Sequence, residues 1–290
     1  MVGDERFSRH LELFGEAGQA RIATKDLTVV GASGVGTPTL LYLAFLGPKR
    51  IRIIEPGYLK ESSRNRNFAA RNSDASDVTR KVDIAARMVG LKSSRTTVDI
   101  IPDRLESDAA FAAIESADYV FGCVDHDGVR FVLNEVCLAY DRPLIDMASD
   151  VQADSEEFGG RIAVVRPGEG CLYCLGLLDD EDVRRYLSSR RELLNEAATY
   201  GVPVDDLAPG TGPSVATING IIAGLGITEF WASVTGLRQP HRTITYLGSE
   251  TTIRKSKDEP ISDCYYCTVV RGAGLASGVH RHIERLNSAA

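Results

Sequence analysis

The chain has 290 residues, of which 43% are apolar, and its 33 basic and 40 acidic residues give a formal net charge of −7. This length and apolar content fit either one large α/β domain with a buried core or two smaller domains. An acidic balance does not attract nucleic-acid phosphates, so no nucleic-acid partner is expected.

Short β-branched runs alternate with longer helical patterns from residue 27 onward. This alternation predicts a parallel sheet with crossover helices, in a doubly wound, Rossmann-like nucleotide fold. The expected strands are 27–31, 50–55, 96–101, 119–123 and 144–148, and the expected helices are 37–46, 80–90, 108–116 and 129–140.

The pattern changes after Gly160. A strand at 161–166, a charged helical segment at 181–198, a loop rich in Gly and Pro and a long apolar helix from Val215 are expected there. Runs 242–247 and 251–254 are expected to be antiparallel strands. The tail 277–290, with His280, Arg281, His282 and Arg285, is expected to be a solvated or frayed end.

A glycine-rich turn, residues 31–36, joins the first predicted strand to the first predicted helix. Gly31 permits the tight turn, Gly34 lets the backbone approach a phosphate, and Gly36 lets the helix pack on the sheet. Ser33 stands where a dinucleotide motif has its second glycine, so the motif is imperfect. Glu55 ends the second strand, where an acid would hold ribose hydroxyls.

Charged residues follow the carboxyl ends of two predicted strands, where ligands bind in open α/β sheets. Arg66 and Lys81 come after the second strand and are expected to reach a triphosphate on the glycine turn. Arg80 is an alternative to Lys81. Asp125 follows the 119–123 strand and suits Mg²⁺ held together with phosphate oxygens.

Four of the six cysteines form two Cys-x-x-Cys pairs, Cys171 with Cys174 and Cys264 with Cys267. Two such turns predict one structural, tetrahedral zinc site; a redox dithiol, disulfides, packing cysteines or an iron–sulfur cluster are the alternatives. Reduced thiols favour a cytoplasmic protein. The start lacks the apolar core of a signal peptide, and the apolar stretch 218–234 is interrupted by glycines and Glu229, so neither export nor a membrane span is expected.

Together these residues resemble the ThiF/MoeB superfamily, which includes the adenylating domains of ubiquitin-activating enzymes, and specifically a bacterial-type, stand-alone member. The resemblance covers residues 6–267 and rests on an ordered set of motifs: Arg6-Phe7-Ser8-Arg9-His10, Gly18-Gln19, the turn 31–36, Arg66, Lys81, Cys123-Val124-Asp125 and the two cysteine pairs. It implies one integrated domain with a helical arm at 1–26, an ATP-binding half at 27–170, a zinc-clamped half at 171–270 and a tail at 271–290.

The resemblance implies an ATP- and Mg²⁺-dependent adenylyltransferase. It would activate a C-terminal carboxylate, foremost the terminal glycine of a ubiquitin-like, β-grasp protein, and release pyrophosphate. Glu55 matches the ribose-binding acid, Arg66 and Lys81 the phosphate-binding pair, and Asp125 the magnesium-linked aspartate. Arg9 matches an arginine that family homodimers extend into the neighbouring active site.

Two positions depart from the family pattern. A second acid often follows the ribose acid and an asparagine often precedes the phosphate arginine, but Gly57 and Ser63 stand there. Ser63 is retained as a candidate nucleotide-binding residue, and Asn65 or Asn67 are possible replacements for the asparagine.

Family members that carry the substrate on a thiol have a cysteine in the loop at 201–214, and this chain has none there. Cys123 and Cys137 fit core positions, so the acyl-adenylate is expected to pass to a separate sulfur-transfer or conjugating protein.

Other functions remain open. The carboxylate could belong to a small molecule, a peptide or a modified nucleoside, although a peptide-specific enzyme would often carry an extra N-terminal recognition domain. The chain could also be an inactive subunit of a heterodimeric activating enzyme, which the retention of Arg9, Arg66, Lys81 and Asp125 disfavours. A nicotinamide-dependent dehydrogenase is supported only by the glycine turn and Glu55.

Overall fold

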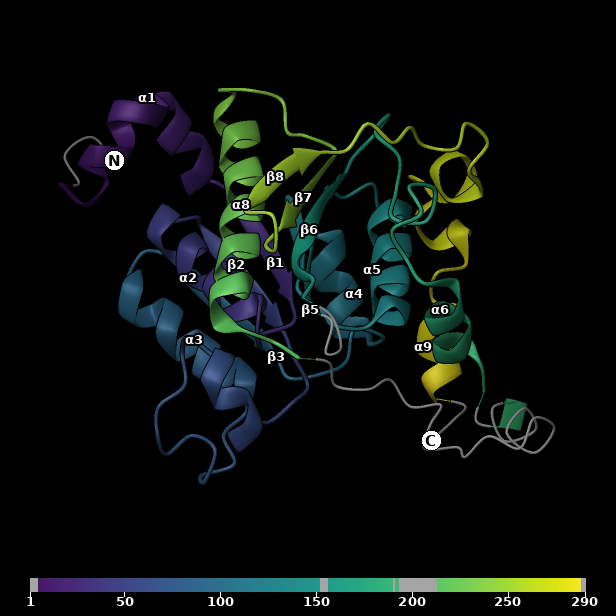
Figure 1. Ribbon diagram of the computed structural model, residues 1–290, viewed down its shortest axis with the longest axis horizontal. Coiled ribbons are helices and arrows are strands. Elements are labelled where there is room, and N and C mark those ends of the chain that lie inside the picture. The colour runs from purple at the N-terminus through teal and green to yellow at the C-terminus, as the bar shows by residue number, and fades with distance from the viewer. Residues whose placement is uncertain (1–4, 152–155, 190, 193–212, 288–290) are drawn as a thin grey trace.

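Eight strands form a single sheet in a computed structural model that describes residues 5–151, 156–189, 191–192 and 213–287 (Figure 1). The strand order is β3-β2-β1-β4-β5-β6-β7-β8, with parallel pairing from β3 to β5 and antiparallel pairing from β5 to β8. The strands are β1 Asp26–Val30, β2 Arg50–Ile54, β3 Thr97–Ile101, β4 Tyr119–Gly122, β5 Leu144–Val151, β6 Phe158–Val165, β7 Thr243–Leu247 and β8 Thr252–Lys255. The predicted mostly parallel sheet with an antiparallel extension is confirmed.

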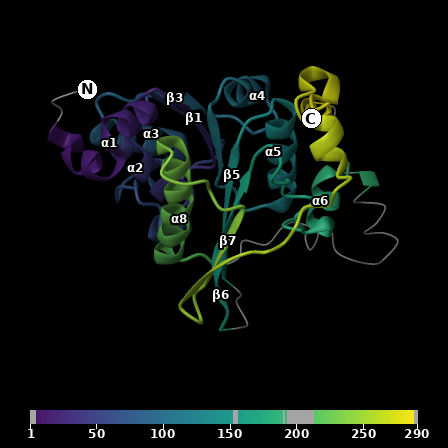
Figure 2. The same ribbon diagram turned by 90° about the horizontal axis from the view of Figure 1, so that it is seen from above.

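Helices cover both faces of the sheet (Figure 2). One layer holds α1 Ser8–Ala23, α2 Gly36–Leu46, α3 Lys81–Lys92 and α8 Ala216–Thr235, and the other holds α4 Asp108–Glu115, α5 Asp127–Ala139, α6 Asp180–Leu187 and α9 Arg281–Asn287. Shorter turns are η1 Glu5–Phe7, η2 Glu61–Arg66, η4 Tyr266–Val270 and η5 Gly274–Ser277.

The sequence of β1 explains why both faces are covered. Leu27 and Val29 belong to one hydrophobic cluster, whereas Val30 belongs to the cluster on the opposite face. Successive side chains of a strand point to opposite faces, so a strand that is buried at each of its positions from Leu27 to Val30 needs helices on both sides.

The parallel half has a switch point beside β1. This strand pairs with β2 on one side and with β4 on the other. The strand order therefore reverses at β1, and the helices that follow β1 and β4 lie on opposite faces of the sheet (Figure 2). Ligands of open α/β sheets bind outside the carboxyl ends of the strands at such a point. The topology therefore brings the segments after β1, β2 and β4 to one edge.

The antiparallel half is longer than the sequence pattern predicted. β5 and β6 pair along eight residues each, from Leu144 with Val165 to Val151 with Phe158, and therefore extend beyond the predicted 144–148 and 161–166. α6 ends at Leu187, and residues 193–198 of the predicted 181–198 helix lie outside the described residues, as does most of the 201–214 loop. No helix in the described part of the chain is long and apolar enough to cross a bilayer.

The expectation of a solvated or frayed tail is wrong for residues 277–287. Val279, in the turn before α9, and Ile283 within α9 are both buried in the hydrophobic cluster on the α5 side of the sheet. Arg281 and His282 contact the buried carboxylate of Glu135 on α5, at 2.6 and 2.8 Å. These contacts anchor the C-terminal helix to the body of the protein.

We expect Glu135→Gln to lower the free energy of unfolding at neutral pH by about 1–3 kcal/mol, because the buried carboxylate loses its charge-assisted hydrogen bonds with Arg281 and His282. Burial alone would raise the pKa of Glu135, but hydrogen bonds from His282 and Arg281 outweigh it and hold the pKa below its ordinary value. The contribution is therefore complete above about pH 4.3, the ordinary glutamate pKa, and is lost as the pH falls through the folded-state pKa.

Urea unfolding of both proteins from neutral to acidic pH measures the difference. Glu115→Gln, which changes an exposed glutamate on α4, is the matched control and should leave stability nearly unchanged. A stability deficit that persists undiminished at the lowest pH would contradict this assignment.

Candidate active site and metal centre

A cavity of about 660 Å³ lies over the carboxyl ends of the parallel strands. Cationic and acidic side chains line it together, which suits a phosphate ligand accompanied by a divalent cation. The charged lining residues are Arg66, Lys81, Arg104, Arg130, Glu55, Glu106, Asp125 and Asp150.

The glycine turn forms one wall of the cavity and has the geometry that its sequence predicted. Gly31 has φ of +96°, and a side chain there would approach the Cys123 carbonyl oxygen to 2.6 Å. A side chain at Gly36 would come within 2.0 Å of the Gly31 carbonyl oxygen. Only glycine permits this tight passage from β1 into α2.

The turn also presents unused backbone donors. The N–H groups of Ser33, Gly34, Val35 and Gly36 have no acceptor within the described part of the chain, while Ala32 and Thr37 on either side are hydrogen-bonded. α2 begins at Gly36, so its positive dipole end adds to these donors. Free N–H groups at a helix start bind anions such as phosphate.

Glu55 is buried behind the turn with both carboxylate oxygens in use. Oε2 accepts from the Ala32 N–H at 3.0 Å, Oε1 accepts from the Gly57 N–H at 2.8 Å, and the Lys81 Nζ lies 3.5 Å from Oε1. A Cβ at position 57 would lie only 2.7 Å from Oε1. The glycine at position 57 thus leaves room for the Glu55 carboxylate and for the Lys81 ammonium group.

The structure distinguishes the two basic candidates at the start of α3. Lys81 lines the cavity, whereas Arg80 turns away to the Tyr58 ring and hydroxyl. Arg66 also lines the cavity, held by the Ser62 carbonyl oxygen at 2.7 Å. Lys81, paired with Glu55, and Arg66 are therefore two of the four cations that line the cavity, and Arg80 is not among them.

Two aspartates lie at the cavity on neighbouring strands. Asp125 follows β4 and Asp150 lies near the end of β5; both are exposed and line the cavity. Among the described residues, no side chain or backbone group binds the Asp125 carboxylate, so it is available to a cation. Asp150 was not predicted, because its strand gave no motif.

A buried arginine supports this edge of the cavity. Arg130 on α5 donates from Nη1 to both oxygens of Asp146, at 3.0 and 2.9 Å, and Arg161 on β6 reaches the same carboxylate at 2.9 Å. Arg130 also donates to the Val124 carbonyl, next to Asp125. An arginine within the apolar run 129–133 was the only sequence signal for this contact.

Three of the predicted site residues lie outside the cavity lining. Gly36 acts through the turn, and Ser63 is buried in η2. Arg9 lies on α1, where its exposed side chain pairs with Glu12 at 3.0 Å. Asn67, suggested as a replacement for the family asparagine, is buried and accepts from the Ala69 N–H, and neither it nor Asn65 lines the cavity.

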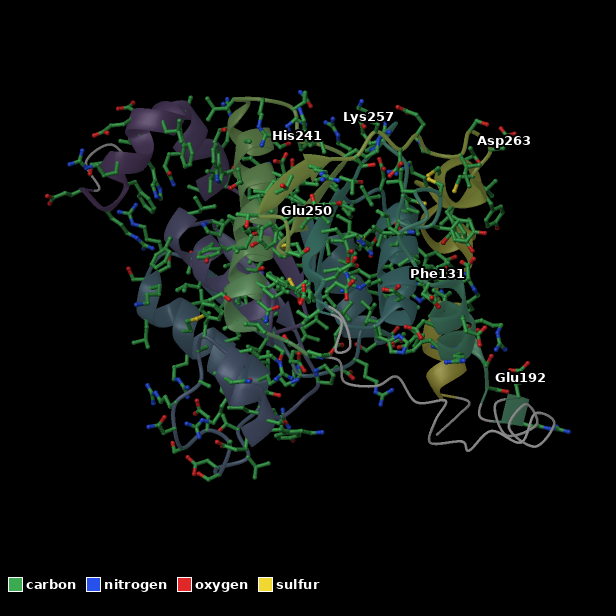
Figure 3. The ribbon with its side chains drawn as sticks, in the orientation of Figure 1. Phe131, Glu192, His241, Glu250, Lys257 and Asp263 are labelled. Atoms are coloured by element: carbon green, nitrogen blue, oxygen red, sulfur yellow. The ribbon has the colours of Figure 1, made fainter. Side chains whose placement is uncertain are left out.

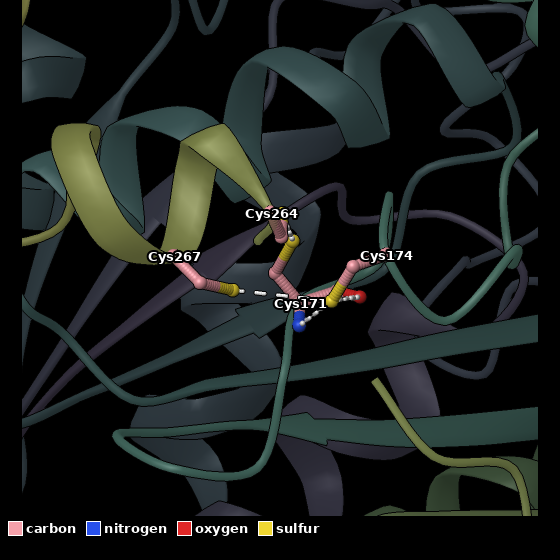
Figure 4. A group of neighbouring side chains, drawn as sticks. All are labelled: Cys171, Cys174, Cys264 and Cys267. Atoms are coloured by element: carbon pink, nitrogen blue, oxygen red, sulfur yellow. Dashed lines mark hydrogen bonds between the residues drawn. The ribbon is translucent and has the colours of Figure 1, made fainter. Parts of the chain in front are cut away.

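The four paired cysteines meet at one point (Figure 4). Their sulfur atoms lie within 4.8 Å of one another, with Cys171 to Cys264 at 3.8 Å and Cys174 to Cys267 at 3.9 Å. A tetrahedron with bonds of about 2.3 Å to a central ion has edges of about 3.8 Å. All six cysteines are free thiols. The cluster can therefore hold a metal ion, and the disulfide alternative is not realised.

Aromatic and polar contacts fix the cluster on α5. Tyr266, between Cys264 and Cys267, packs edge-on against Phe131 of α5, with 5.4 Å between the ring centres. Phe131 can be found in Figure 3, as can Asp263, the residue before Cys264. The Leu172 N–H, between the other two cysteines, donates to Asn134 of the same helix at 3.0 Å. Both cysteine turns are thus held by one rigid element.

The two remaining cysteines are core residues, as predicted. Burial raises the pKa of Cys123 to about 12 despite a hydrogen bond with Thr39, and burial raises the pKa of Cys137 further. A thiol with such a pKa is scarcely ionised at neutral pH and is a poor nucleophile.

Comparisons with known proteins agree on one family. The profile of the ThiF family matches residues 7–265. The SAMP-activating enzyme E1 of Haloferax volcanii is 27% identical over 173 residues, which cover 59% of this chain and 61% of that protein. The adenylyltransferase and sulfurtransferase UBA4 of Candida albicans is 28% identical over 155 residues, covering 53% of this chain and 35% of that protein. The matches thus span less than two thirds of these relatives.

Solved structures show the same fold. The crystal structure of Escherichia coli MccB with MccA-N7isoASN superimposes with a TM-score of 0.72, covering 91% of this chain and 75% of that chain at 16% identity.

Proposed function

Because this chain belongs to the ThiF family, we propose that it is an ATP-dependent adenylyltransferase that activates a C-terminal carboxylate. One observation carries the proposal. A single cavity brings together the N–H groups of the glycine turn, the cations Arg66 and Lys81, and the carboxylate of Asp125, and within the described ranges neither these N–H groups nor this carboxylate has a hydrogen-bond partner. Triphosphate binding and phosphoryl-group chemistry need these three kinds of group together.

The proposed reaction needs no protein nucleophile. An oxygen of the substrate carboxylate attacks the α-phosphorus of ATP, a new C–O–P linkage forms, and pyrophosphate leaves with the electrons of the broken P–O bond. Lys81 and Arg66 stabilise the negative charge that develops on the phosphates. In this proposal the glycine turn orients the phosphates and Glu55 accepts from the ribose hydroxyls; in support, each Glu55 oxygen keeps lone-pair capacity beyond its existing contacts.

Asp125 fits a Mg²⁺ site. It offers a carboxylate oxygen without a competing partner at the cavity, and Mg²⁺ in such sites is typically held by one or two carboxylates plus phosphate oxygens. When bound, Mg²⁺ would neutralise phosphate charge. Asp150 is the second carboxylate on this side.

We infer that the cysteine cluster holds a structural Zn²⁺. Four thiolates within 4.8 Å of one another would form a closed site without an open position for substrate, so the ion would stabilise the fold and take no part in the reaction.

The terminal glycine of a ubiquitin-like protein is the proposed substrate. Two observations support it: the Haloferax volcanii relative is named as a SAMP-activating enzyme, and the antiparallel strands expose apolar side chains, Phe158 and Ile253, on which a protein could dock.

ATP–pyrophosphate exchange with a candidate ubiquitin-like protein tests the proposal. Exchange should require the protein and should vanish when its C-terminal glycine is removed. Exchange stimulated only by peptides or small carboxylic acids would reassign the substrate. The absence of both ATP binding and exchange would refute the proposed adenylyltransferase activity.

No thioester is expected on this chain. Cys123 and Cys137 are buried with raised pKa, and the other four cysteines form the metal cluster. Intact-mass measurement of the enzyme after reaction should show no hydroxylamine-sensitive adduct. Cys137→Ala, which removes a thiol distant from the cavity lining, should retain exchange; a trapped adduct on any cysteine would overturn the expectation.

We further propose a homodimer in which Arg9 enters the neighbouring active site. Arg9 cannot serve its own cavity in the arrangement observed, since it lies exposed on α1 and outside the lining. Mixing inactive Arg9→Ala and Asp125→Ala proteins should restore part of the activity, because a mixed dimer has one complete site. A fully active monomer in sedimentation would contradict this, and Glu12→Ala, which removes only the partner of Arg9, is the control.

A further inference from the structure

Three side chains from distant parts of the chain meet at the cavity wall formed by the segment that follows β3. The Tyr186 hydroxyl of α6 donates to Glu106 Oε1, and the Arg285 Nη2 of α9 lies 3.5 Å from the same oxygen. The Arg285 guanidinium lies 5.0 Å from the centre of the Tyr186 ring and donates to the Tyr186 carbonyl oxygen at 2.5 Å. We refer to Glu106, Tyr186 and Arg285 as the Glu106 clamp.

The clamp leaves one carboxylate oxygen unused. The Glu106 side chain is 2% exposed and lines the cavity, yet both of its partners approach Oε1. No group in the described part of the chain donates a hydrogen bond to Oε2. This oxygen is not among the completely buried atoms that lack a partner, so it is accessible from the cavity. A largely buried carboxylate with a vacant acceptor gains when a ligand supplies an N–H group.

The position of Glu106 relative to the other ligand groups identifies the part of the nucleotide that it faces. This step rests on the proposed function. With phosphates on the glycine turn after β1 and the ribose at Glu55 after β2, the base continues toward the end of β3. The same cavity offers apolar side chains for a base to pack on, including Leu105, which directly precedes Glu106, and Ile54, Val124 and Val129.

We propose that Glu106 determines nucleobase specificity by accepting, through Oε2, a hydrogen bond from the 6-amino group of adenine, while Tyr186 and Arg285 are positioning residues. Burial raises the pKa of Tyr186 and the charge of Glu106 raises it further, so the hydroxyl stays protonated and donates to Oε1. Arg285 joins the C-terminal helix to this wall. The tail, expected from sequence to be solvated, thereby supports the nucleotide cavity.

A comparison of ATP with purine riboside triphosphate tests the proposal, since the analogue lacks only the 6-amino group. In pyrophosphate exchange, the wild type should favour ATP in kcat/KM by about 10- to 100-fold, because the analogue leaves Oε2 unpaired. Glu106→Leu should bring this ratio close to unity. Tyr186→Phe should raise the KM for ATP with little change in kcat and should lower the ratio, as a loosened acceptor discriminates less.

Tyr140→Phe is the matched control, since its hydroxyl contacts His280 and does not line the cavity; its ratio should equal that of the wild type. A wild-type ratio near unity would overturn the proposal without any variant, and so would a Glu106→Leu protein that keeps the preference. Either result obtained with active enzyme refutes only the role of Glu106, whereas absence of ATP binding and exchange refutes the proposed function itself.

Discussion

Asp125→Asn is expected to lower the rate of substrate-dependent pyrophosphate exchange by about 10²- to 10³-fold, the usual cost of removing one electrostatic contact to the transition state. Asp125 lies at the cavity with no competing partner among the described residues, so its charge would be available to a cation bound together with the nucleotide. Asparagine keeps the size of the side chain and removes its charge. We therefore expect kcat to fall and the Mg²⁺ concentration needed for half-maximal rate to rise.

Asp77→Asn is the control for this change. Asp77 is exposed before α3 and does not line the cavity, so the same loss of charge should leave exchange unaffected. Thermal unfolding should be unchanged in both variants, because the Asp125 carboxylate makes no hydrogen bond or ion pair with the residues that the structure describes. Near-normal exchange in Asp125→Asn would remove this residue from the mechanism.

Cys264→Ser is expected to lose the metal ion and much of the stability of the C-terminal half. Structural zinc contributes on the order of 10 kcal/mol in small domains, and even a loss of roughly 4 kcal/mol would lower Tm by about 10 °C in a chain of this size. The cluster joins the 171–174 turn to the 264–267 turn over α5, so its loss releases both. Mass spectrometry under native conditions and thermal unfolding measure the two effects.

Cys137→Ser is the matched substitution outside the cluster. It places a hydroxyl in the core and should destabilise the protein by about 1–3 kcal/mol, yet it should keep one metal ion per chain. Full zinc occupancy in Cys264→Ser, or iron with inorganic sulfide in the wild type, would contradict the zinc assignment.

The parallel half of the fold could be predicted because its signals are local. Alternating strand and helix patterns, together with Gly31 and Gly36, define the switch point, and the carboxyl ends of β1, β2 and β4 then have to meet. The same logic located Glu55, Lys81 and Asp125. The sequence could not decide between Arg80 and Lys81, because the side chains of adjacent residues point in different directions that the sequence does not show. In the structure Arg80 contacts Tyr58, and Lys81 lines the cavity.

The C-terminal helix could not be predicted in the same way. Residues 277–287 are mostly polar or charged, and such a segment is usually solvated unless buried partners exist for it. Those partners, Glu135 and Glu106, lie on distant segments and become known only from the tertiary structure. The Glu106 clamp and the pairing of Arg130 with Asp146 were missed for the same reason, since each joins elements that carry no shared motif.

The cysteine cluster is an intermediate case. The two Cys-x-x-Cys turns predicted a four-thiol site from spacing alone, and the structure brings Cys171 and Cys264, 93 positions apart, to 3.8 Å. The sequence could not show that both turns rest on α5, which makes the site part of the main core rather than a separate module.

Intact-mass analysis of the substrate tests the central proposal most directly. A ubiquitin-like protein with a C-terminal glycine, incubated with this chain, ATP and Mg²⁺ in the presence of pyrophosphatase, should gain the mass of one adenylyl group (AMP less water) at its C-terminus, and Asp125→Asn should slow the gain as strongly as it slows exchange. A substrate that gains phosphate alone or remains unmodified, while ATP is bound and the fold is intact, would contradict an adenylyltransferase acting on a ubiquitin-like protein.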